Sequence, residues 1–167
     1  MNRDFKRIAD LEEMNIEDSA RLLAQALIGN GSLYMYGTKE MEGVALEAFY
    51  GEEPLKGAKP LFENGKLAAI TSADRVLLIS RFSTDAEVVE LAKHLQTEGH
   101  FIVGISAIKE GMHSLEQFTD VHIDTRLMKG LIPDEDGGRF GFPSLIVSLF
   151  AYYGLKFTID EIMAEYK

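Results

Sequence analysis

The sequence predicts a doubly wound α/β domain, in which helices flank a mainly parallel, five-stranded sheet. Two apolar runs without alternation, Val76–Ile79 and Phe101–Ile105, are typical of parallel strands that are covered on both faces. Between them, apolar residues recur at spacings of three and four over residues 88–95, which predicts a helix with one inward stripe. These elements form a β-α-β unit with a right-handed crossover. The remaining elements extend the pattern, so residues 1–167 are predicted to form one domain.

The central helix carries start and stop signals at its two ends. Thr84 followed by Glu87 predicts a capping box, in which the hydroxyl and the carboxylate each accept a backbone N–H. Gly99 is predicted to end the helix, because glycine adopts a left-handed conformation easily. The polar corner that precedes the helix lies at the sheet edge where open α/β sheets bind ligands.

The flanking segments divide the chain into two N-terminal helices over 1–30 and a core over 31–153. A strand at 32–36 breaks at Gly37-Thr38, and a third helix runs from about Met41 to Gly51. Proline and glycine punctuate residues 52–71, which predicts a long connection with one strand at most.

The last part of the core contains a short strand over Val121–Ile123 and a surface loop over 124–142. Pro143 suits the first turn of a helix that reaches about Tyr153 and is apolar nearly all round. Such a helix is buried in the domain or in a subunit contact. A separate, short tail helix is expected within 154–167.

Composition restricts the partners of the protein. With 17 basic and 27 acidic residues the net charge is −10, which disfavours nucleic acid and anionic membranes. The absence of cysteine excludes disulfides and thiolate metal sites and is compatible with a reducing compartment. The N-terminal residues lack the apolar core of a signal peptide, and the longest apolar run is too short to span a bilayer. We therefore expect a cytoplasmic protein.

Two corners follow predicted strands, at Tyr36-Gly37-Thr38-Lys39 and after Asp74 to Ser80. The first is similar to the first phosphate corner of the sugar isomerase (SIS) domain family, and the second stretch is similar to the D-V-V-I-x-I-S segment of that family. Val103 to Ser106, with the later Thr119 to Ile123, is similar to its V-I-G-I-T … A-D-V-V-I ending. The likeness extends from about Gly31 to Tyr153 and is greatest to small, single-domain members such as phosphoheptose isomerase. It implies a flavodoxin-like, three-layer α/β/α arrangement.

The resemblance implies that a sugar phosphate binds at the carboxyl edge of the sheet. A phosphate monoester suits backbone N–H groups and hydroxyls at a helix N-terminus. The residues expected to bind it are Gly37, Thr38, Lys39, Ser80, Arg81, Ser83 and Thr84, with Arg139 on the 124–142 loop, which we expect to act as a lid. The alternative is purely structural: serine and threonine act as helix caps, and Arg81 pairs with a surface carboxylate.

The sequence departs from the family at positions that matter for catalysis. Phe82-Ser83 replaces Ser-Gly in the second corner, and the last long helix has no histidine. Isomerisation needs an acid and a base, and the candidates that remain are Glu47 and His113. Three hypotheses therefore stay open: an isomerase with relocated groups, a non-catalytic sensor of sugar phosphates, and a degenerate fold that binds a protein partner.

Cofactors and assembly complete the expectations. The four histidines have no metal spacing, and neither a P-loop nor a dinucleotide fingerprint occurs, so no metal and no cofactor is expected. The apolar helix from Pro143 and the stripe over 16–27 offer more apolar surface than a small sheet covers. We therefore expect a homo-oligomer, either a dimer or a tetramer.

Overall fold

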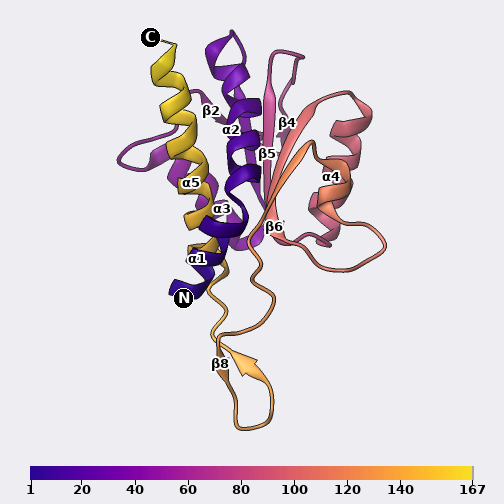
Figure 1. The fold of residues 1–167 in the computed structure, drawn as a ribbon. Helices are drawn as coiled ribbons and strands as arrows, with labels where there is room; N and C mark the ends of the chain where they lie inside the picture. Colours follow the sequence, from indigo (N-terminus) through magenta and orange to yellow (C-terminus); the bar gives the residue numbers. More distant parts are fainter. Residues whose placement is uncertain (167) are drawn as a thin grey trace.

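The computed structural model describes residues 1–166 and contains a five-stranded, all-parallel sheet in the order β2-β1-β5-β6-β7 (Figure 1). The sheet strands are β1 (Leu33–Gly37), β2 (Ala58–Pro60), β5 (Arg75–Phe82), β6 (Phe101–Ala107) and β7 (Val121–Asp124). The helices are α1 (Asn2–Leu11), α2 (Glu13–Ile28), α3 (Glu42–Tyr50), α4 (Ala86–Thr97) and α5 (Ser144–Glu165). Short 3-10 turns are η1 (Lys39–Met41) and η2 (Leu115–Phe118). The predicted fold class is confirmed.

The strand order creates a topological switch point between β1 and β5. From β1 the chain moves outward to β2, whereas from β5 it moves in the opposite direction through β6 to β7. The two strands are paired in parallel from Leu33 opposite Arg75 to Gly37 opposite Ile79. Their carboxyl ends therefore open side by side, and doubly wound sheets bind ligands at this crevice.

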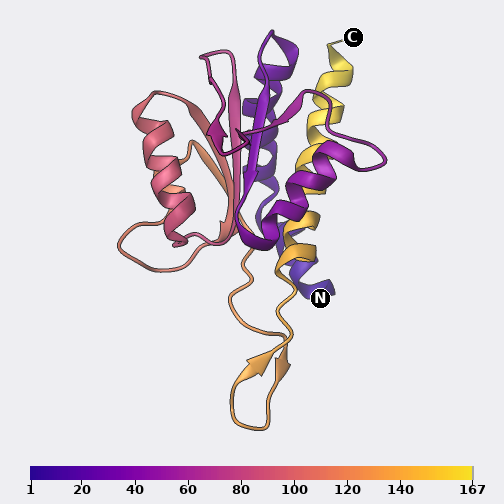
Figure 2. The ribbon, with the colours of Figure 1, turned by 180° about the vertical axis from the view of Figure 1, so that it is seen from behind.

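Helices and loops cover the two faces of the sheet unequally, as Figures 1 and 2 show from opposite sides. Helices α1, α2, α3 and α5 pack on one face in a large cluster that includes Met35, Leu77, Ile79 and Val103. Helix α4 and η2 pack on the other face against Val76, Leu78 and Ile102. Alternate residues of β5 thus enter opposite clusters, which explains why its sequence is apolar without alternation.

The C-terminal helix differs from the prediction. Instead of one helix to about Tyr153 and a separate tail helix, α5 is continuous from Ser144 to Glu165. Gly154 lies inside it, facing α2, where an added Cβ would be in ordinary van der Waals contact with Ile16 Cδ1 at 3.5 Å. The glycine therefore does not end the helix, and the packing of α5 on α2 keeps the helix continuous. No helix within residues 1–166 is both long and apolar enough to cross a membrane.

The start of α4 also differs from the prediction, because its first residues have tertiary partners. Asp85 is the N-cap residue, and no side chain caps the helix. Glu87 instead accepts a hydrogen bond from the Tyr36 hydroxyl of β1. This bond, together with burial, raises the pKa of Tyr36 to about 12. The predicted Thr84–Glu87 capping box is therefore wrong.

Two segments that were predicted to be irregular contain short hairpins. Residues 52–71 supply the edge strand β2 and a hairpin of β3 (Phe62–Glu63) and β4 (Lys66–Leu67). The 124–142 segment forms a hairpin of β8 (Ile132–Pro133) and β9 (Arg139–Phe140), which projects beyond the body of the domain (Figure 1). Both hairpins have only two paired residues on each strand, too few for periodicity in the sequence to reveal.

Candidate functional site

The two polar corners meet at the switch point. The Thr38 backbone N–H donates to the Ile79 carbonyl at 3.0 Å, and its hydroxyl donates to Asp85 Oδ2 at 3.2 Å. These bonds join the loop after β1 to the end of β5 and to the start of α4. Thr38 is only 2% exposed, so it joins the two corners from inside the protein and is not available to a ligand at the surface.

The first corner is a tight turn that requires glycine. A Cβ on Gly37 would lie 2.1 Å from the Met41 carbonyl oxygen, well inside van der Waals contact. Lys39 adopts a positive φ of 52°, which is uncommon for a residue with a side chain. The chain thus turns back over Gly37, and Lys39 lies exposed beside a hollow of about 430 Å³.

The second corner carries an ion pair that spans the switch point. Pairing of β5 with β6 is irregular between Ile79 and Phe82, and irregular pairing of this kind commonly redirects side chains near sites. Arg81 donates from Nε and one terminal nitrogen to Glu40 at 2.7 and 2.8 Å. The Ser144 hydroxyl, at the start of α5, donates to Glu40 at 2.6 Å.

This ion pair forms part of a pocket of about 330 Å³, which we call the switch-point pocket. It is lined by Glu40, Arg81, Phe82, Phe142 and Ser144. The Phe82 and Phe142 rings are 5.7 Å apart in an edge-to-face arrangement and form its apolar wall. The pocket therefore combines one bound carboxylate, one guanidinium, one hydroxyl and two aromatic rings.

The electrostatics of Glu40 follow from these contacts. Burial disfavours the charged carboxylate, but hydrogen bonds from Arg81 and Ser144 outweigh it and lower the pKa of Glu40 from 4.5 to about 2. Glu40 is therefore ionised throughout the physiological range. Because its pKa is so low, it is a poor general acid or base near neutral pH.

We expect Glu40 to make stability depend on pH. Its folded-state pKa lies below the unfolded value, so its contribution is present above about pH 4.5 and is lost as the pH falls through about 2. Since Arg81 is 39% exposed and solvent screens the pair, we expect a contribution of about 1–2 kcal/mol. Urea unfolding at about pH 5 and pH 3 should show a smaller acid-induced loss in Glu40→Gln than in the wild type. Equal losses in both proteins would contradict this assignment.

The serine residues predicted to bind phosphate are occupied by internal bonds. Ser80 is fully buried, and its hydroxyl donates to the Phe82 carbonyl at 2.8 Å. Ser83 is also fully buried and accepts hydrogen bonds from the Lys109 N–H at 2.8 Å and the Ser114 hydroxyl at 2.6 Å. Both side chains thus support the corner from within, and only a rearrangement would present their hydroxyls to a ligand.

Thr84 lies beside the loop that follows β6. A Cβ added to Gly111 would lie 2.7 Å from the Thr84 methyl group, so the two chain segments pass closely here. The expected roles of Thr84, Ser80 and Ser83 in phosphate binding stay predictions.

The two expected catalytic residues lie on opposite faces of the sheet. Glu47 is on α3, where it accepts a hydrogen bond from the Tyr153 hydroxyl of α5. His113 is exposed in the loop after β6, and its ring centroid lies 6.3 Å from that of Phe118 in η2. Since α3 and α5 cover one face and η2 covers the other, one chain does not bring this pair together.

Arg139 lines a different cavity from the other predicted ligand-binding residues. Its guanidinium donates to the carbonyls of Gly130 at 2.6 Å and Leu131 at 3.0 Å. The cavity has a volume of about 750 Å³ and lies between α1 and the loop after β7. Its role as a lid residue over the switch-point pocket stays a prediction.

Several residues of the site were not identified from the sequence. Glu40 and Ser144 complete the polar part of the switch-point pocket, and Phe142 completes its apolar wall. Only Glu40 had an indirect signal in the sequence, since one alternative expected Arg81 to pair with a carboxylate. The structure confirms that pairing and shows that the carboxylate is Glu40. Within residues 1–166 no group of three or more acidic or histidine side chains is arranged to hold a metal ion.

Comparison with known sequences assigns the family. Residues 3–163 match the family described as "Domain of unknown function (DUF2529)". The chain belongs to this family. It is also 46% identical over 162 residues to the uncharacterized protein YwjG of Bacillus subtilis (strain 168), covering 97% of this chain and 92% of that protein.

Comparison with solved structures identifies the fold that the DUF2529 family adopts in this chain. A proposed phosphosugar isomerase of Silicibacter pomeroyi DSS-3 superposes with a TM-score of 0.65 at 12% identity, over 95% of this chain and 47% of the other. The E. coli CFT073 protein c3406, solved in complex with a sugar phosphate, superposes with a TM-score of 0.62 at 15% identity. The match covers 98% of this chain and 88% of the other. A proposed phosphosugar isomerase of Bacteroides fragilis NCTC 9343 superposes with a TM-score of 0.61 at 17% identity. The match covers 90% of this chain and 79% of the other. The expected SIS-type fold is confirmed.

Proposed function

We propose that this protein binds a sugar phosphate, or a similar small phosphate ester, in the switch-point pocket and acts as a non-catalytic sensor. The observation that carries the proposal is the pocket itself, with Arg81, Ser144 and two aromatic rings at the crevice between β1 and β5. The fold neighbours support the ligand class, since one of them was solved with a bound sugar phosphate.

The polar side of the pocket has donors that suit a phosphate. Arg81 offers a planar guanidinium that matches phosphate oxygens in pairs. Ser144 adds a hydroxyl, and the first turn of the 22-residue helix α5 adds backbone N–H groups and the positive end of the helix dipole. Lys39, which precedes Glu40 in the first corner, is exposed and lines the neighbouring hollow rather than this pocket.

Glu40 occupies these donors in the structure. Its carboxylate accepts from Arg81 and Ser144 as a phosphate would, and the two anions would repel each other. The ligand therefore competes with Glu40, and binding exchanges an internal anion for an external one. The Phe82 and Phe142 rings then cover the apolar C–H groups of the sugar.

The same pocket gives no support for isomerisation. A proton must move between adjacent carbons, which requires groups whose pKa lies near the working pH. Glu40 has a pKa of about 2, and no histidine lines the pocket within the described chain. For these reasons we favour the sensor over the isomerase.

Thermal denaturation with a panel of sugar phosphates tests the proposal. A ligand at 100 times its dissociation constant adds about 2.7 kcal/mol to the free energy of unfolding. We expect at least one member to raise the melting temperature of the wild type, and Arg81→Gln to lower its affinity at least about tenfold. Arg21→Gln removes the same charge from an exposed pair on α2 and should leave binding unchanged. A panel without any stabilising member would overturn the proposal.

A protein-interaction module is the second candidate. It is favoured by the fact that Glu40 already satisfies Arg81 and Ser144 without any ligand. Under this alternative, no sugar phosphate stabilises the protein, and Arg81→Gln changes stability alone. The panel therefore separates the two candidates directly.

We also expect the protein to form a dimer. Helix α5 leaves Ile146 and Phe157 45% and 55% exposed, about three turns apart on the same side of the helix. Exposed apolar residues that share one helix face suit a subunit contact, whereas single exposed apolar residues are common on monomers. Sedimentation should show a dimer that Phe157→Glu dissociates. Met112→Glu, in the exposed loop after β6, is the matched control and should leave the dimer intact. A wild-type monomer at all accessible concentrations would rule out this assembly.

A further inference from the structure

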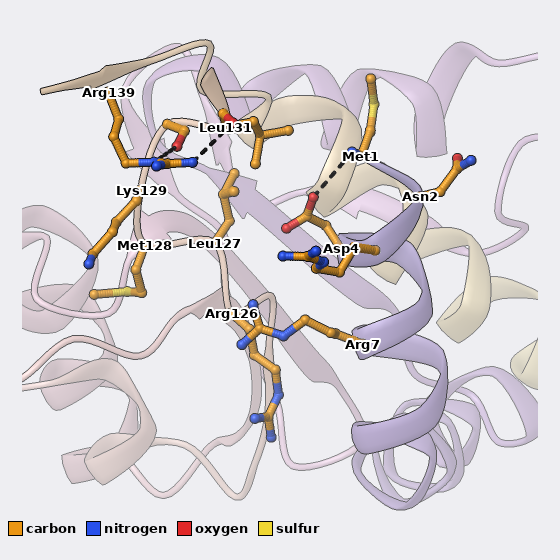
Figure 3. Close-up of a pocket in the computed structure, with 12 residues that line it drawn as sticks. Met1, Asn2, Asp4, Arg7, Arg126, Leu127, Met128, Lys129, Leu131 and Arg139 are labelled. Atoms are coloured by element: carbon orange, nitrogen blue, oxygen red, sulfur yellow. Dashed lines mark hydrogen bonds and ion pairs between the residues drawn. The ribbon is translucent and has the colours of Figure 1, made fainter. Parts of the chain in front are cut away.

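The geometry points to a second ligand site: a cavity of about 750 Å³ that binds a small polyanion with two or more phosphate groups. We call it the basic cavity. It lies between the first two turns of α1 and the loop over 126–131, with Arg139 of β9 on its far wall (Figure 3). It shares no lining residue with the switch-point pocket, and the inference does not depend on the function proposed for that pocket.

Positive charge is concentrated in the basic cavity against the charge of the whole protein. The chain has a net charge of −10, yet the cavity has one carboxylate, Asp4, in its lining. Its cationic side chains are Arg3, Arg7, Arg126, Lys129 and Arg139. A concave site of one sign attracts ligands of the opposite sign even when the overall field repels them.

Most of this charge has no internal counterion. Within residues 1–166, the side chains of Arg3, Arg7 and Lys129 make no hydrogen bond or ion pair. Arg139 is held by two neutral carbonyl groups, so its charge is not cancelled. Arg126 alone is paired, with the buried carboxylate of Glu12 at 2.8 Å. The uncompensated cluster is the group that an anionic ligand would neutralise.

Like charges lie close together in the basic cavity. Arg3 and Arg7 are four residues apart on α1, a spacing at which like charges repel, while Asp4 and Asp10, each three residues from Arg7, offset part of that repulsion. In Figure 3, Arg7 extends from α1 toward Arg126 on the facing loop, which brings a third positive charge toward the pair. An anionic ligand in the cavity would reduce the repulsion among these positive charges.

The backbone of the facing loop is strained where it presents Arg126. This residue has a φ of 61°, and its N–H donates to Asp124 Oδ1 at 2.8 Å, which holds the turn. Left-handed conformations of residues with side chains cost free energy and occur preferentially at ligand sites. Arg139 is likewise fixed by its two carbonyl acceptors (Figure 3). Two of the cationic side chains are thus positioned before any ligand arrives.

The distribution of charge indicates the class of ligand. Arginines bind phosphate oxygens in pairs, and here they lie on both walls of the cavity, so a ligand with charge at two places fits best. The net charge of −10 disfavours extended polyanions such as nucleic acid. A compact molecule that carries two phosphate groups, such as a sugar bisphosphate or a nucleoside diphosphate, meets both conditions.

Calorimetry with inorganic pyrophosphate at constant ionic strength tests the site. We expect saturable binding to the wild type and at least about tenfold weaker binding to Arg7→Gln, because a charge-assisted contact is lost. Lys6→Gln is the matched control: Lys6 is exposed on the same helix and carries the same charge, but it does not line the cavity. It should change the affinity less than about twofold. Glutamine preserves helix propensity, and Arg7→Gln should unfold at or above the wild-type temperature.

Three results would overturn the inference. The first is no saturable binding of pyrophosphate at millimolar concentration. The second is equal weakening by Arg7→Gln and Lys6→Gln, which would show a general charge effect. The third is binding that Arg81→Gln abolishes and Arg7→Gln preserves, which would place the anion in the switch-point pocket. Failure of the sugar phosphate panel alone would leave the basic cavity unaffected, so the two proposals fail separately.

Discussion

Replacing Gly37 with alanine is expected to destabilise the protein by about 3 kcal/mol or more. The new Cβ would lie 2.1 Å from the Met41 carbonyl oxygen and 2.4 Å from its carbon, and neither is the end of a flexible side chain. The backbone of the first corner must therefore move. Because Glu40 lies in that corner, its bonds to Arg81 and Ser144 should also be broken.

Denaturant unfolding of Gly37→Ala and Gly138→Ala measures this effect. Gly138 is the matched control, since an added Cβ there would have no heavy atom within 4 Å and the residue has no positive φ. It should change the free energy of unfolding by less than about 0.5 kcal/mol. If the two variants are equally stable, the close approach at Gly37 is not present in solution.

Replacing Glu12 with alanine is expected to lower the free energy of unfolding by about 3 kcal/mol. Glu12 is 1% exposed and lies between α1 and α2. It accepts hydrogen bonds from the Asp124 N–H at 2.8 Å, from Asn15 at 3.1 Å and from the Arg126 guanidinium at 2.8 and 3.2 Å. Its removal leaves a backbone donor and a partly buried cation without partners.

The exposed Glu17–Arg21 pair provides the control for Glu12. Its carboxylate is 44% exposed and accepts from Arg21 at 2.7 Å, one turn apart on α2. Glu17→Ala should therefore cost less than about 1 kcal/mol, as exposed pairs do. If Glu12→Ala loses no more stability than Glu17→Ala, the bonds from Glu12 to Asp124 and Arg126 contribute little to the free energy of unfolding.

The fold was predictable from the sequence where burial acts on whole segments. The apolar runs of β5 and β6 and the stripe of α4 were predicted from periodicity, and the structure confirms them. Prediction failed where a tertiary contact overrides a local signal. The helix expected to end near Tyr153 continues to Glu165 because it packs on α2, and Glu87 indicated a cap but binds Tyr36. Such partners lie far away in sequence, so no local pattern reveals them.

The candidate site was predictable only as a location. The corners after β1 and β5 were expected to bind a ligand from the SIS resemblance and from the edge at which open α/β sheets bind ligands. The structure places the two corners side by side, and ligand binding there stays a prediction. The side chains at that place were harder to predict. Glu40 and Arg81 are far apart in sequence, and Ser144 joins them from a third segment. Their convergence depends on the packing of α5 beside the first corner, which is a property of the whole fold.

The pairing of Arg81 with Glu40 changes how the corners bind an anion. A serine-rich corner of the family type would bind phosphate with its own hydroxyls, whereas Ser80 and Ser83 are buried here. The available donors are instead those that Glu40 occupies. Under the function proposed above, a phosphate ligand in the switch-point pocket therefore displaces the Glu40 carboxylate from Arg81 and Ser144.

The affinity of Glu40→Gln for a sugar phosphate tests this central claim most directly. Titration calorimetry at constant ionic strength would compare this variant with the wild type, using the sugar phosphate that stabilises the wild type most. The amide removes the competing negative charge and leaves Arg81 available, so we predict about tenfold tighter binding. Unchanged or weaker binding would contradict the claim, because it would mean that the phosphate lies elsewhere or that Glu40 itself holds the ligand.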